Sequence, residues 1–181
     1  MDQEEVRLIE KFLDGSDVAF NKLIKSYQKN IYWHARRMVG NHLDADEITQ
    51  QVIIVLYKKL KTFKFNSSLK TWIYKIVSTR SLNMIKRRKI KKFFSLNSKD
   101  AKELRTTTDI IKNFEDKEKI NQLNKKLSKI PVKQREVFVL RHFDELSYEE
   151  ISEITAKSIG GLKANYFHAS KKILGIMDNE K

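Results

Sequence analysis

The sequence predicts an all-α protein in which an N-terminal helical bundle is linked to a C-terminal helix-turn-helix domain. Among 181 residues there are only five glycines and one proline, while Leu, Ile, Lys and Glu abound. Such a composition favours helices over a turn-rich β architecture. Apolar residues recur at helical spacing on both sides of a segment, residues 93–117, that has no sustained apolar stripe. The length suits one ordinary domain or two small ones, and the pattern indicates two.

The N-terminal bundle is expected over residues 1–92, with its first helix signal at Ser16-Asp17, which can cap a helix. The apolar residues that follow at i, i+3, i+4 and i+7 spacing are Phe20, Leu23, Ile24 and Tyr27. The next segment keeps this pattern toward Val39 and stops at Gly40-Asn41.

A third helix is expected to open at residues 44–47, Asp-Ala-Asp-Glu, which resemble a capping box. Its apolar residues are Ile48, Val52, Ile53, Val55, Leu56 and Leu60. The turn-forming residues 65–68 precede a fourth helix, which runs into the basic residues 86–89 and holds Trp72, Ile73, Ile76, Leu82 and Ile85. Four helices with short connections make a compact bundle, and residues 93–117 are expected to form a linker.

The C-terminal domain is expected over residues 118–181. Pro131 interrupts its first stripe in the way that prolines start a new helix. Ser147 and Glu150 form a Ser-x-x-Glu capping box for a short helix, and Ser158 is the expected cap of the last helix. The inward stripe expected for that last helix consists of Ile159, Leu162, Tyr166, Ala169 and Ile173.

Two short helices, a turn and a longer terminal helix are the layout of a helix-turn-helix. The second helix of that motif fits the major groove of DNA and can read base edges. Here its polar face presents Lys163, Ala164, Asn165, Phe167, His168, Lys171 and Lys172. On composition alone, a helical hairpin with a solvated basic face explains this pattern equally well.

Positive charge is concentrated in one segment. The formal net charge is +14, and residues 48–99 carry 14 Lys and Arg without a single Asp or Glu. The remaining 23 basic residues balance all 23 acidic ones. So concentrated a field attracts a polyanion, either nucleic acid or an anionic membrane surface, although a solvated helix face is the simpler alternative.

Several classes of protein are not supported. No apolar run approaches the roughly 20 residues that span a bilayer, so membrane insertion is not expected. The acidic N-terminus lacks a signal-peptide pattern, and the chain has no cysteine for a disulfide framework, so we expect a cytoplasmic protein. The four histidines have no metal-binding spacing, and no acid–base pair is evident. We therefore expect no metal, no cofactor and no catalysis.

The residues of the C-terminal domain resemble region 4 of the extracytoplasmic-function sigma factors. The resemblance is carried by residues 146–151 (Leu-Ser-Tyr-Glu-Glu-Ile), 158–163, 169–174 and 127–131, with Arg135-Glu136-Val137 and Leu140-Arg141. In the N-terminal domain, residues 44–52 resemble the polymerase-binding helix of region 2 of the same family. Phe63, residues 72–76 and residues 86–88 match the remainder of that region. Both halves match in order, with the linker between them.

The resemblance implies a specificity subunit that binds core RNA polymerase and directs initiation by recognising −35 and −10 promoter elements. It implies contacts with double-stranded and single-stranded promoter DNA, and leaves open whether an anti-sigma factor holds the chain inactive. The implied polymerase-binding residues are Asp46, Glu47, Gln50, Gln51 and Ile54. Those for the −10 element are Lys64, Phe65, Asn66, Ser67, Ser68, Trp72, Lys75 and Thr79. Those for the −35 element are Arg141, Tyr148, Ser158, Lys163, Ala164, Asn165, Phe167, His168 and Lys171.

The same segment offers Phe63, Trp72 and Tyr74 for stacking with single-stranded DNA, interleaved with lysines. For Phe63 and Trp72, packing in the core is an equally good expectation.

The chain departs from the family pattern at several sites. The usual Glu-Asp order is Asp46-Glu47, Gln51 replaces a common Glu, and Thr79 replaces a usual Asn. Arginines are common in the family where this chain has Asn165, His168 and Ser170. Because of these changes, the resemblance does not specify which promoter sequence is recognised. They also suggest that the C-terminal domain binds DNA phosphates more weakly.

Two other functions remain as alternatives. A stand-alone helix-turn-helix regulator explains the C-terminal third but needs a dimer surface and leaves the N-terminal bundle without a role. An enzyme acting on nucleic acid explains the basic segment but lacks catalytic residues.

Overall fold

The computed structural model describes residues 3–63, 65–95 and 114–178, and within them the chain forms helices and no strand. The all-α prediction is confirmed. The helices are α1 (Gln3–Leu13), α2 (Asp17–Val39), α3 (His42–Lys59), η1 (Leu60–Thr62), α4 (Leu69–Ser95), α5 (Phe114–Ser128), α6 (Val132–Phe138), η2 (Val139–Phe143), α7 (Tyr148–Thr155) and α8 (Ile159–Asp178).

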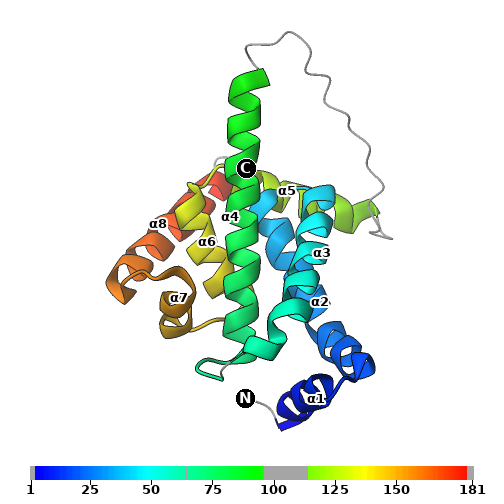
Figure 1. Cartoon of the computed structure of the whole chain (residues 1–181). Helices are drawn as coiled ribbons and strands as arrows, with labels where there is room; N and C mark the ends of the chain where they lie inside the picture. Colours follow the sequence, from blue (N-terminus) through cyan, green and yellow to red (C-terminus); the bar gives the residue numbers. More distant parts are fainter. Residues whose placement is uncertain (1–2, 64, 96–113, 179–181) are drawn as a thin grey trace.

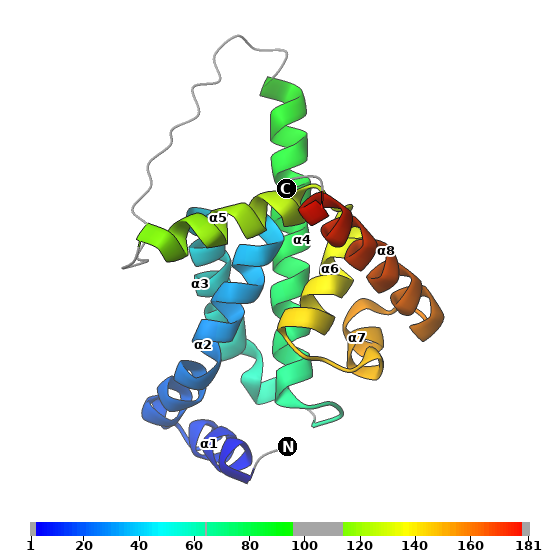
Figure 2. The same ribbon diagram turned by 180° about the vertical axis from the view of Figure 1, so that it is seen from behind.

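Helix α4 is the central column of the molecule. Helices α2 and α3 pack on one side of it, and α6, α7 and α8 lie on the other (Figure 1). Seen from behind, α5 crosses α2 and leads back to the C-terminal helices (Figure 2). The last turns of α4 project beyond the packed helices in both views.

The N-terminal helices agree with the sequence patterns, with three differences. Helix α1 was not predicted, because its apolar stripe is short. The stripe consists of Leu8, Ile9 and Phe12, which are buried against the bundle. The pattern from Ser16 to Val39 forms one continuous helix, α2. Helix α3 begins earlier than the expected capping box at residues 44–47, because Asn41 already accepts a hydrogen bond from the Asp44 N–H at 2.9 Å.

The ends of the helices follow local rules. Ser16 caps α2 by accepting a hydrogen bond from the Ala19 N–H at 3.3 Å. Gly40 ends α2 in the left-handed conformation with φ +85°, which glycine adopts without steric cost. Ser147 and Glu150 form the predicted capping box of α7, with both reciprocal hydrogen bonds present.

The two halves share one apolar core, in which the buried side chains of the first four helices continue into those of α6, η2, α7 and α8. The residues from the C-terminal half are Val137, Leu140, Leu146, Ile151, Ile154 and Leu162. A smaller cluster beneath α5 and α8 consists of Leu127, Ile130, Phe138 and Ala169. Burial of each large apolar side chain contributes roughly 1.5–3 kcal/mol, so this shared core favours contact between the halves.

Within the expected inward stripe of α8, Leu162 and Ala169 are fully buried and Tyr166 and Ile173 are half-buried. Ile159 is exposed, so its placement in that stripe was wrong. It occupies the first position of α8, ahead of the turn that meets α6 and α7.

The proposed linker, residues 93–117, lies largely outside the described residues. Helix α4 continues through Ser95, and α5 begins at Phe114, so described helices enter this range from both sides. None of the helices in the described ranges is long and apolar enough to cross a membrane.

Candidate nucleic-acid interface

The predicted −35 residues of α8 share one exposed face. Lys163, Phe167 and Lys171 are four residues apart, as are Ala164 and His168, and all five are exposed. The opposite face carries Leu162 and Ala169, which have no exposed surface. Because burial fixes that face inward, the helix presents the predicted reading residues to solvent.

Ser158 and Asn165 are tied to the start of α8. The Ser158 hydroxyl accepts a hydrogen bond from the Gly161 N–H at 3.3 Å, as the predicted cap would. The amide of Asn165 donates to the Gly161 carbonyl at 2.8 Å and lies half-buried. These contacts stabilise the first turns of the helix, so Asn165 is less available to DNA than its neighbours.

Two cationic side chains lie near the ring of Tyr148, the first residue of α7. The guanidinium carbon of Arg141 lies 5.2 Å from the centre of the Tyr148 ring, and Lys163 Nζ lies 5.8 Å from it. Arg141 also donates a hydrogen bond to the Leu146 carbonyl at 2.9 Å. The structure thus brings three predicted −35 residues together from separate elements.

The predicted −10 residues lie on and before α4. Ser68, Trp72, Lys75 and Thr79 are spaced i, i+4, i+7 and i+11, which places them on one helix face. Lys75 and Thr79 are exposed. Ser68 accepts a hydrogen bond from the Thr71 N–H at 3.0 Å and so serves as a helix cap.

Three aromatic rings form a row beside this face. The ring centres of Phe65 and Phe63 are 4.9 Å apart, and those of Phe63 and Trp72 are 5.1 Å apart. Phe65 is 44% exposed and Trp72 is half-buried, so Phe65 is the more accessible ring. Asn66 is exposed and Ser67 is half-buried, whereas Lys64 lies outside the described residues.

Phe65 has a backbone φ of +57°, in the left-handed region that non-glycine residues seldom occupy. Such a conformation costs of the order of 1–3 kcal/mol and persists where surrounding contacts enforce it. In this chain it turns the accessible ring onto Phe63 at the end of the row.

Tyr74 does not join this row. Its side chain is 3% exposed, and its hydroxyl donates a hydrogen bond to Asp144 of the C-terminal half. The expectation that Tyr74 is available for stacking is therefore wrong for this conformation. Burial raises the pKa of Tyr74 far above its usual value, and the nearby carboxylate of Asp144 raises it further.

The predicted polymerase-binding residues lie along the outer face of α3. Asp46, Glu47, Gln50 and Ile54 are exposed, and Gln51 is half-buried. Gln50 donates to Asp46 at 3.1 Å and Gln51 donates to Glu47 at 2.8 Å, each one helical turn apart. Leu43 and Ile54, both more than half exposed, flank these polar groups. Exposed apolar side chains beside ordered polar ones are typical of a protein-contact surface.

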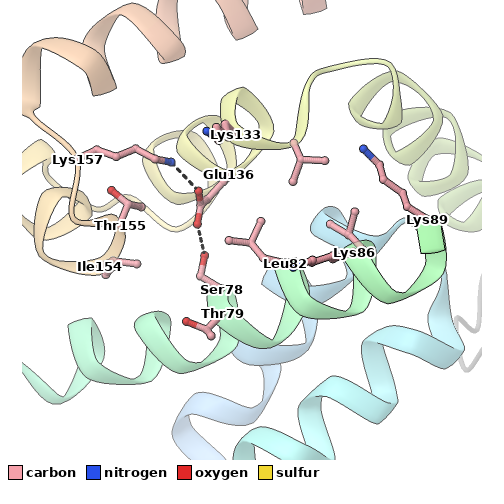
Figure 3. Close-up of a pocket in the computed structure, with 12 residues that line it drawn as sticks. Ser78, Thr79, Leu82, Lys86, Lys89, Lys133, Glu136, Ile154, Thr155 and Lys157 are labelled. Atoms are coloured by element: carbon pink, nitrogen blue, oxygen red, sulfur yellow. Dashed lines mark hydrogen bonds and ion pairs between the residues drawn. The ribbon is translucent and has the colours of Figure 1, made fainter. Parts of the chain in front are cut away.

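A groove of about 510 Å³ separates α4 from α6 and α7. Figure 3 shows Ser78 of α4 and Lys157 of the turn before α8 both reaching Glu136 of α6. The two contacts with the Glu136 carboxylate measure 3.1 Å and 3.0 Å. Leu82 and Ile154 are among its apolar lining residues, and its lysines are Lys86, Lys89, Lys133 and Lys157. Sequence reasoning missed this groove, because no local pattern indicates which helices will face each other.

Within the part of the chain that the structure describes, no three His, Asp or Glu side chains gather in a way that could hold a metal ion.

The comparisons with known proteins match both halves. The model of Sigma-70 region 2 matches residues 23–90, and that of Sigma-70, region 4 matches residues 120–173. The RNA polymerase sigma factor YlaC of Bacillus subtilis is 31% identical over 145 residues, covering 79% of this chain and 82% of YlaC. The ECF RNA polymerase sigma factor SigW of the same organism is 29% identical over 173 residues, covering 92% of each chain.

A solved structure has a similar fold. It is the sigma factor RpoE from Bartonella quintana in complex with the anti-sigma factor NepR. The similarity covers 90% of this chain and 98% of RpoE, with a TM-score of 0.71 at 17% sequence identity.

Proposed function

This chain belongs to the RNA polymerase sigma factors of the extracytoplasmic-function type, and we propose that it divides promoter recognition between its two halves. It directs transcription initiation by RNA polymerase at promoters. In the proposal, α3 docks on core polymerase, α4 with the loop before it captures the −10 element, and α8 reads the −35 element.

The observation that carries the proposal is the α8 face. A helix-turn-helix reads DNA with one exposed face of its second helix. Lys163, Phe167 and His168 lie on that face near the start of the helix, and α8 carries no acidic side chain before Asp178. The face therefore suits the negative potential of the major groove.

The acid-free helix α4 supports the proposed −10 role. It combines Lys75 and the basic run 86–89 with the row of aromatic rings that ends in Phe65. Lysines along a groove neutralise phosphates, while an exposed ring stacks on an unpaired base, which contributes about 1–3 kcal/mol per base. Melting exposes such bases at a cost of a few kcal/mol, which these contacts offset.

The outer face of α3 is the proposed polymerase contact. It is far more polar than the buried face of the same helix, which carries Ile48, Val52 and Leu56. Yet it keeps Leu43 and Ile54 exposed, which offer apolar area to a partner.

The stand-alone regulator is not favoured, because the region 2 match covers the half that such a regulator would leave without a role. We assign the chain a binding role, with the chemistry of RNA synthesis left to the polymerase. We place it in the cytoplasm, where promoters and polymerase meet. A further proposed partner is an anti-sigma factor, as in the complex of RpoE with NepR.

The test is run-off transcription with purified core RNA polymerase on fragmented host DNA, followed by sequencing of the start sites. We expect start sites that share −35 and −10 motifs and that are absent without the sigma factor. The comparison is the double variant Asp46→Ala/Gln50→Ala, which removes polar groups from the proposed docking face. It should lose co-purification with core polymerase while keeping its helical circular dichroism. Transcription identical with and without the wild-type chain would contradict the proposed function.

A further inference from the structure

A second groove lies between α2 and α3, which pack side by side in the N-terminal half (Figure 1). It has a volume of about 410 Å³ and shares no lining residue with the groove beside Glu136. That volume is within the range of small-molecule sites, about 300–1,000 Å³. Its lining includes three rings, two lysines and one carboxylate, namely Tyr32, Trp33, His42, Lys25, Lys29 and Asp46. We call this groove the α2–α3 pocket.

The three rings form an aromatic corner of the pocket. The ring centre of Tyr32 lies 5.3 Å from that of Trp33 and 5.8 Å from that of His42, with an edge-to-face arrangement in both pairs. The Tyr32 hydroxyl and Nδ1 of His42 are 2.8 Å apart, so a hydrogen bond joins the two helices at this corner. All three side chains are half-buried. Their mutual contacts therefore hold the rings in place while part of each remains accessible to a planar ligand.

The two lysines lie earlier on α2 than the rings. Lys25, Lys29 and Tyr32 are spaced i, i+4 and i+7, which places them on one face of the helix. Both lysines are exposed. At 1.5 Å per residue, Lys29 is about 5 Å and Lys25 about 10 Å along the helix axis from Tyr32. A phosphate that a sugar joins to a planar base can reach these ammonium groups, which bind phosphate by charge-assisted hydrogen bonds.

Asp46 contributes the acceptor of the pocket from α3. Its side chain is exposed, and its Oδ2 accepts a hydrogen bond from Gln50 at 3.1 Å. A carboxylate has about four lone-pair sites, so Asp46 can also accept hydrogen bonds from N–H groups of a ligand. It lies one helical turn after His42, whose ring belongs to the aromatic corner. The pocket thus combines rings and an N–H acceptor with cations, which matches the base and the phosphate of a nucleotide.

We propose that the α2–α3 pocket binds a purine nucleoside monophosphate. The base stacks on the rings of Tyr32 and Trp33 and donates an N–H group to Asp46, and the phosphate contacts Lys25 and Lys29. Asp46 also belongs to the proposed polymerase contact on α3, so a bound nucleotide occupies this carboxylate and weakens docking on core polymerase. That consequence rests on the proposed function, whereas the binding site itself does not.

Isothermal titration calorimetry of the full chain with GMP, with AMP and with inorganic phosphate tests the site. We expect at least one of the two nucleotides to bind with a stoichiometry of one. Inorganic phosphate should bind about tenfold more weakly or not at all, because it cannot stack on the rings.

Two variants remove the two parts of the pocket separately. Lys25→Ala/Lys29→Ala removes the cations, and Trp33→Leu removes one ring while it keeps an apolar side chain. Lys58→Ala/Lys59→Ala is the matched control, because it removes the same charge from exposed lysines at the end of α3, outside the pocket. We expect each pocket variant to weaken nucleotide binding about tenfold or more, and the control to match the wild type.

The fluorescence of Trp33 tests where the nucleotide binds. The chain has two tryptophans, so Trp33 is the sole tryptophan of a Trp72→Phe chain. A base stacked on its ring should quench this fluorescence over the same concentrations that the calorimetry reports. Fluorescence that stays constant while nucleotide binds would place the nucleotide elsewhere.

Three further results would overturn the proposed site. They are an absence of binding by both GMP and AMP, an equal loss of binding in Lys58→Ala/Lys59→Ala, and inorganic phosphate that binds as tightly as the nucleotides. If Trp33→Leu loses helical circular dichroism, Lys25→Ala/Lys29→Ala alone decides the outcome, since both of its lysines are exposed.

Co-purification with core polymerase, with and without the nucleotide that binds, tests the effect on docking. The nucleotide should lower co-purification of the wild type and leave that of Lys25→Ala/Lys29→Ala unchanged, which excludes an action on the polymerase itself. Equal co-purification of the wild type in both conditions refutes the effect on docking. A wild type that does not bind core polymerase in either condition refutes the proposed function, whereas the nucleotide site is decided by the calorimetry.

Discussion

Lys163 and Lys172 lie on the same exposed helix and differ in where they meet DNA. Lys163 is in the first turns of α8 and close to the ring of Tyr148, where a recognition helix faces base edges. Lys172 lies more than two turns further along and is exposed. Lys163 is therefore expected to contact base edges, and Lys172 to contact phosphates of the DNA backbone.

We predict that Lys163→Ala or His168→Ala changes which −35 sequences are used, at a cost of about 1–3 kcal/mol when a good base contact is lost. Lys172→Ala should instead weaken binding evenly across promoters and lower its dependence on salt. Selection from a promoter library with each variant distinguishes these effects. A Lys163→Ala variant with the sequence preferences of the wild type would remove Lys163 from the reading role.

A second residue-scale prediction concerns Tyr74 at alkaline pH. Burial and the nearby Asp144 raise the pKa of Tyr74 above the usual tyrosine value of about 10, so the folded chain keeps this proton where the unfolded chain loses it. This contribution is fully present below pH 10 and is lost as the pH rises further, because the unfolded state then binds fewer protons. The loss amounts to up to about 1.4 kcal/mol per pH unit.

Urea unfolding at pH 9, 10 and 11 measures this effect. The wild type should lose stability above pH 10 more steeply than Tyr74→Phe, which cannot ionise at this position. The lysines and the other tyrosines are present in both proteins, so the comparison isolates the hydroxyl of Tyr74. Parallel curves for the two proteins would show that Tyr74 ionises as easily in the folded chain as in the unfolded one.

At the scale of elements, the loop before α4 provides the sharpest test of strand capture. Phe65 and Asn66 are exposed, whereas Ser68 caps α4. We predict that Phe65→Ser/Asn66→Gly, with Ser68 retained, spares polymerase binding and abolishes promoter melting, because the accessible ring at the end of the aromatic row is lost. Permanganate reactivity of unpaired thymines reports melting, and persistent reactivity would place the base pocket elsewhere.

The control for the loop is Ser68→Ala. It removes the hydroxyl that accepts from the Thr71 N–H and should cost about 1 kcal/mol of stability, with melting retained. A loss of melting in this variant would indicate that the helix start matters more than the ring.

Elements with local signals could be predicted from the sequence. The Ser16 cap and the Ser147–Glu150 capping box each join residues three positions apart. Both partners of each hydrogen bond can therefore be identified within a short stretch of sequence. The exposed face of α8 follows from helical periodicity around Leu162 and Ala169. Ile159 was wrongly assigned to the buried stripe of α8, because the spacing of apolar residues does not show where the partner helices end.

Elements that depend on distant partners could not be predicted. The segment η2 is a π-helical turn, which widens the helix after α6 and leads directly to Phe143 and Asp144. Those two side chains contact Arg37 and His34, more than a hundred residues earlier. No pattern within the η2 sequence indicates that contact, so the burial of Tyr74 and the groove beside Glu136 were also missed.

At the scale of the whole molecule, the shared core should make the two halves unfold together. Both tryptophans, Trp33 and Trp72, lie in the N-terminal half, so tryptophan fluorescence reports that half alone. Leu140 is fully buried in the C-terminal part of the shared core. A cavity created at Leu140 therefore tests whether a loss of stability in the C-terminal half also lowers the stability of the N-terminal half.

We predict that the thermal transitions of the wild type by tryptophan fluorescence and by far-ultraviolet circular dichroism coincide, as for a single cooperative unit. Leu140→Ala should cost about 2–5 kcal/mol and lower the midpoint seen by the tryptophans, although neither lies in its half. Leu174→Ala removes the same atoms from a side chain that is 61% exposed, and should leave both midpoints unchanged. If Leu140→Ala lowers only the circular dichroism midpoint while the tryptophan transition stays in place, the halves fold independently and the apolar contact between them contributes little.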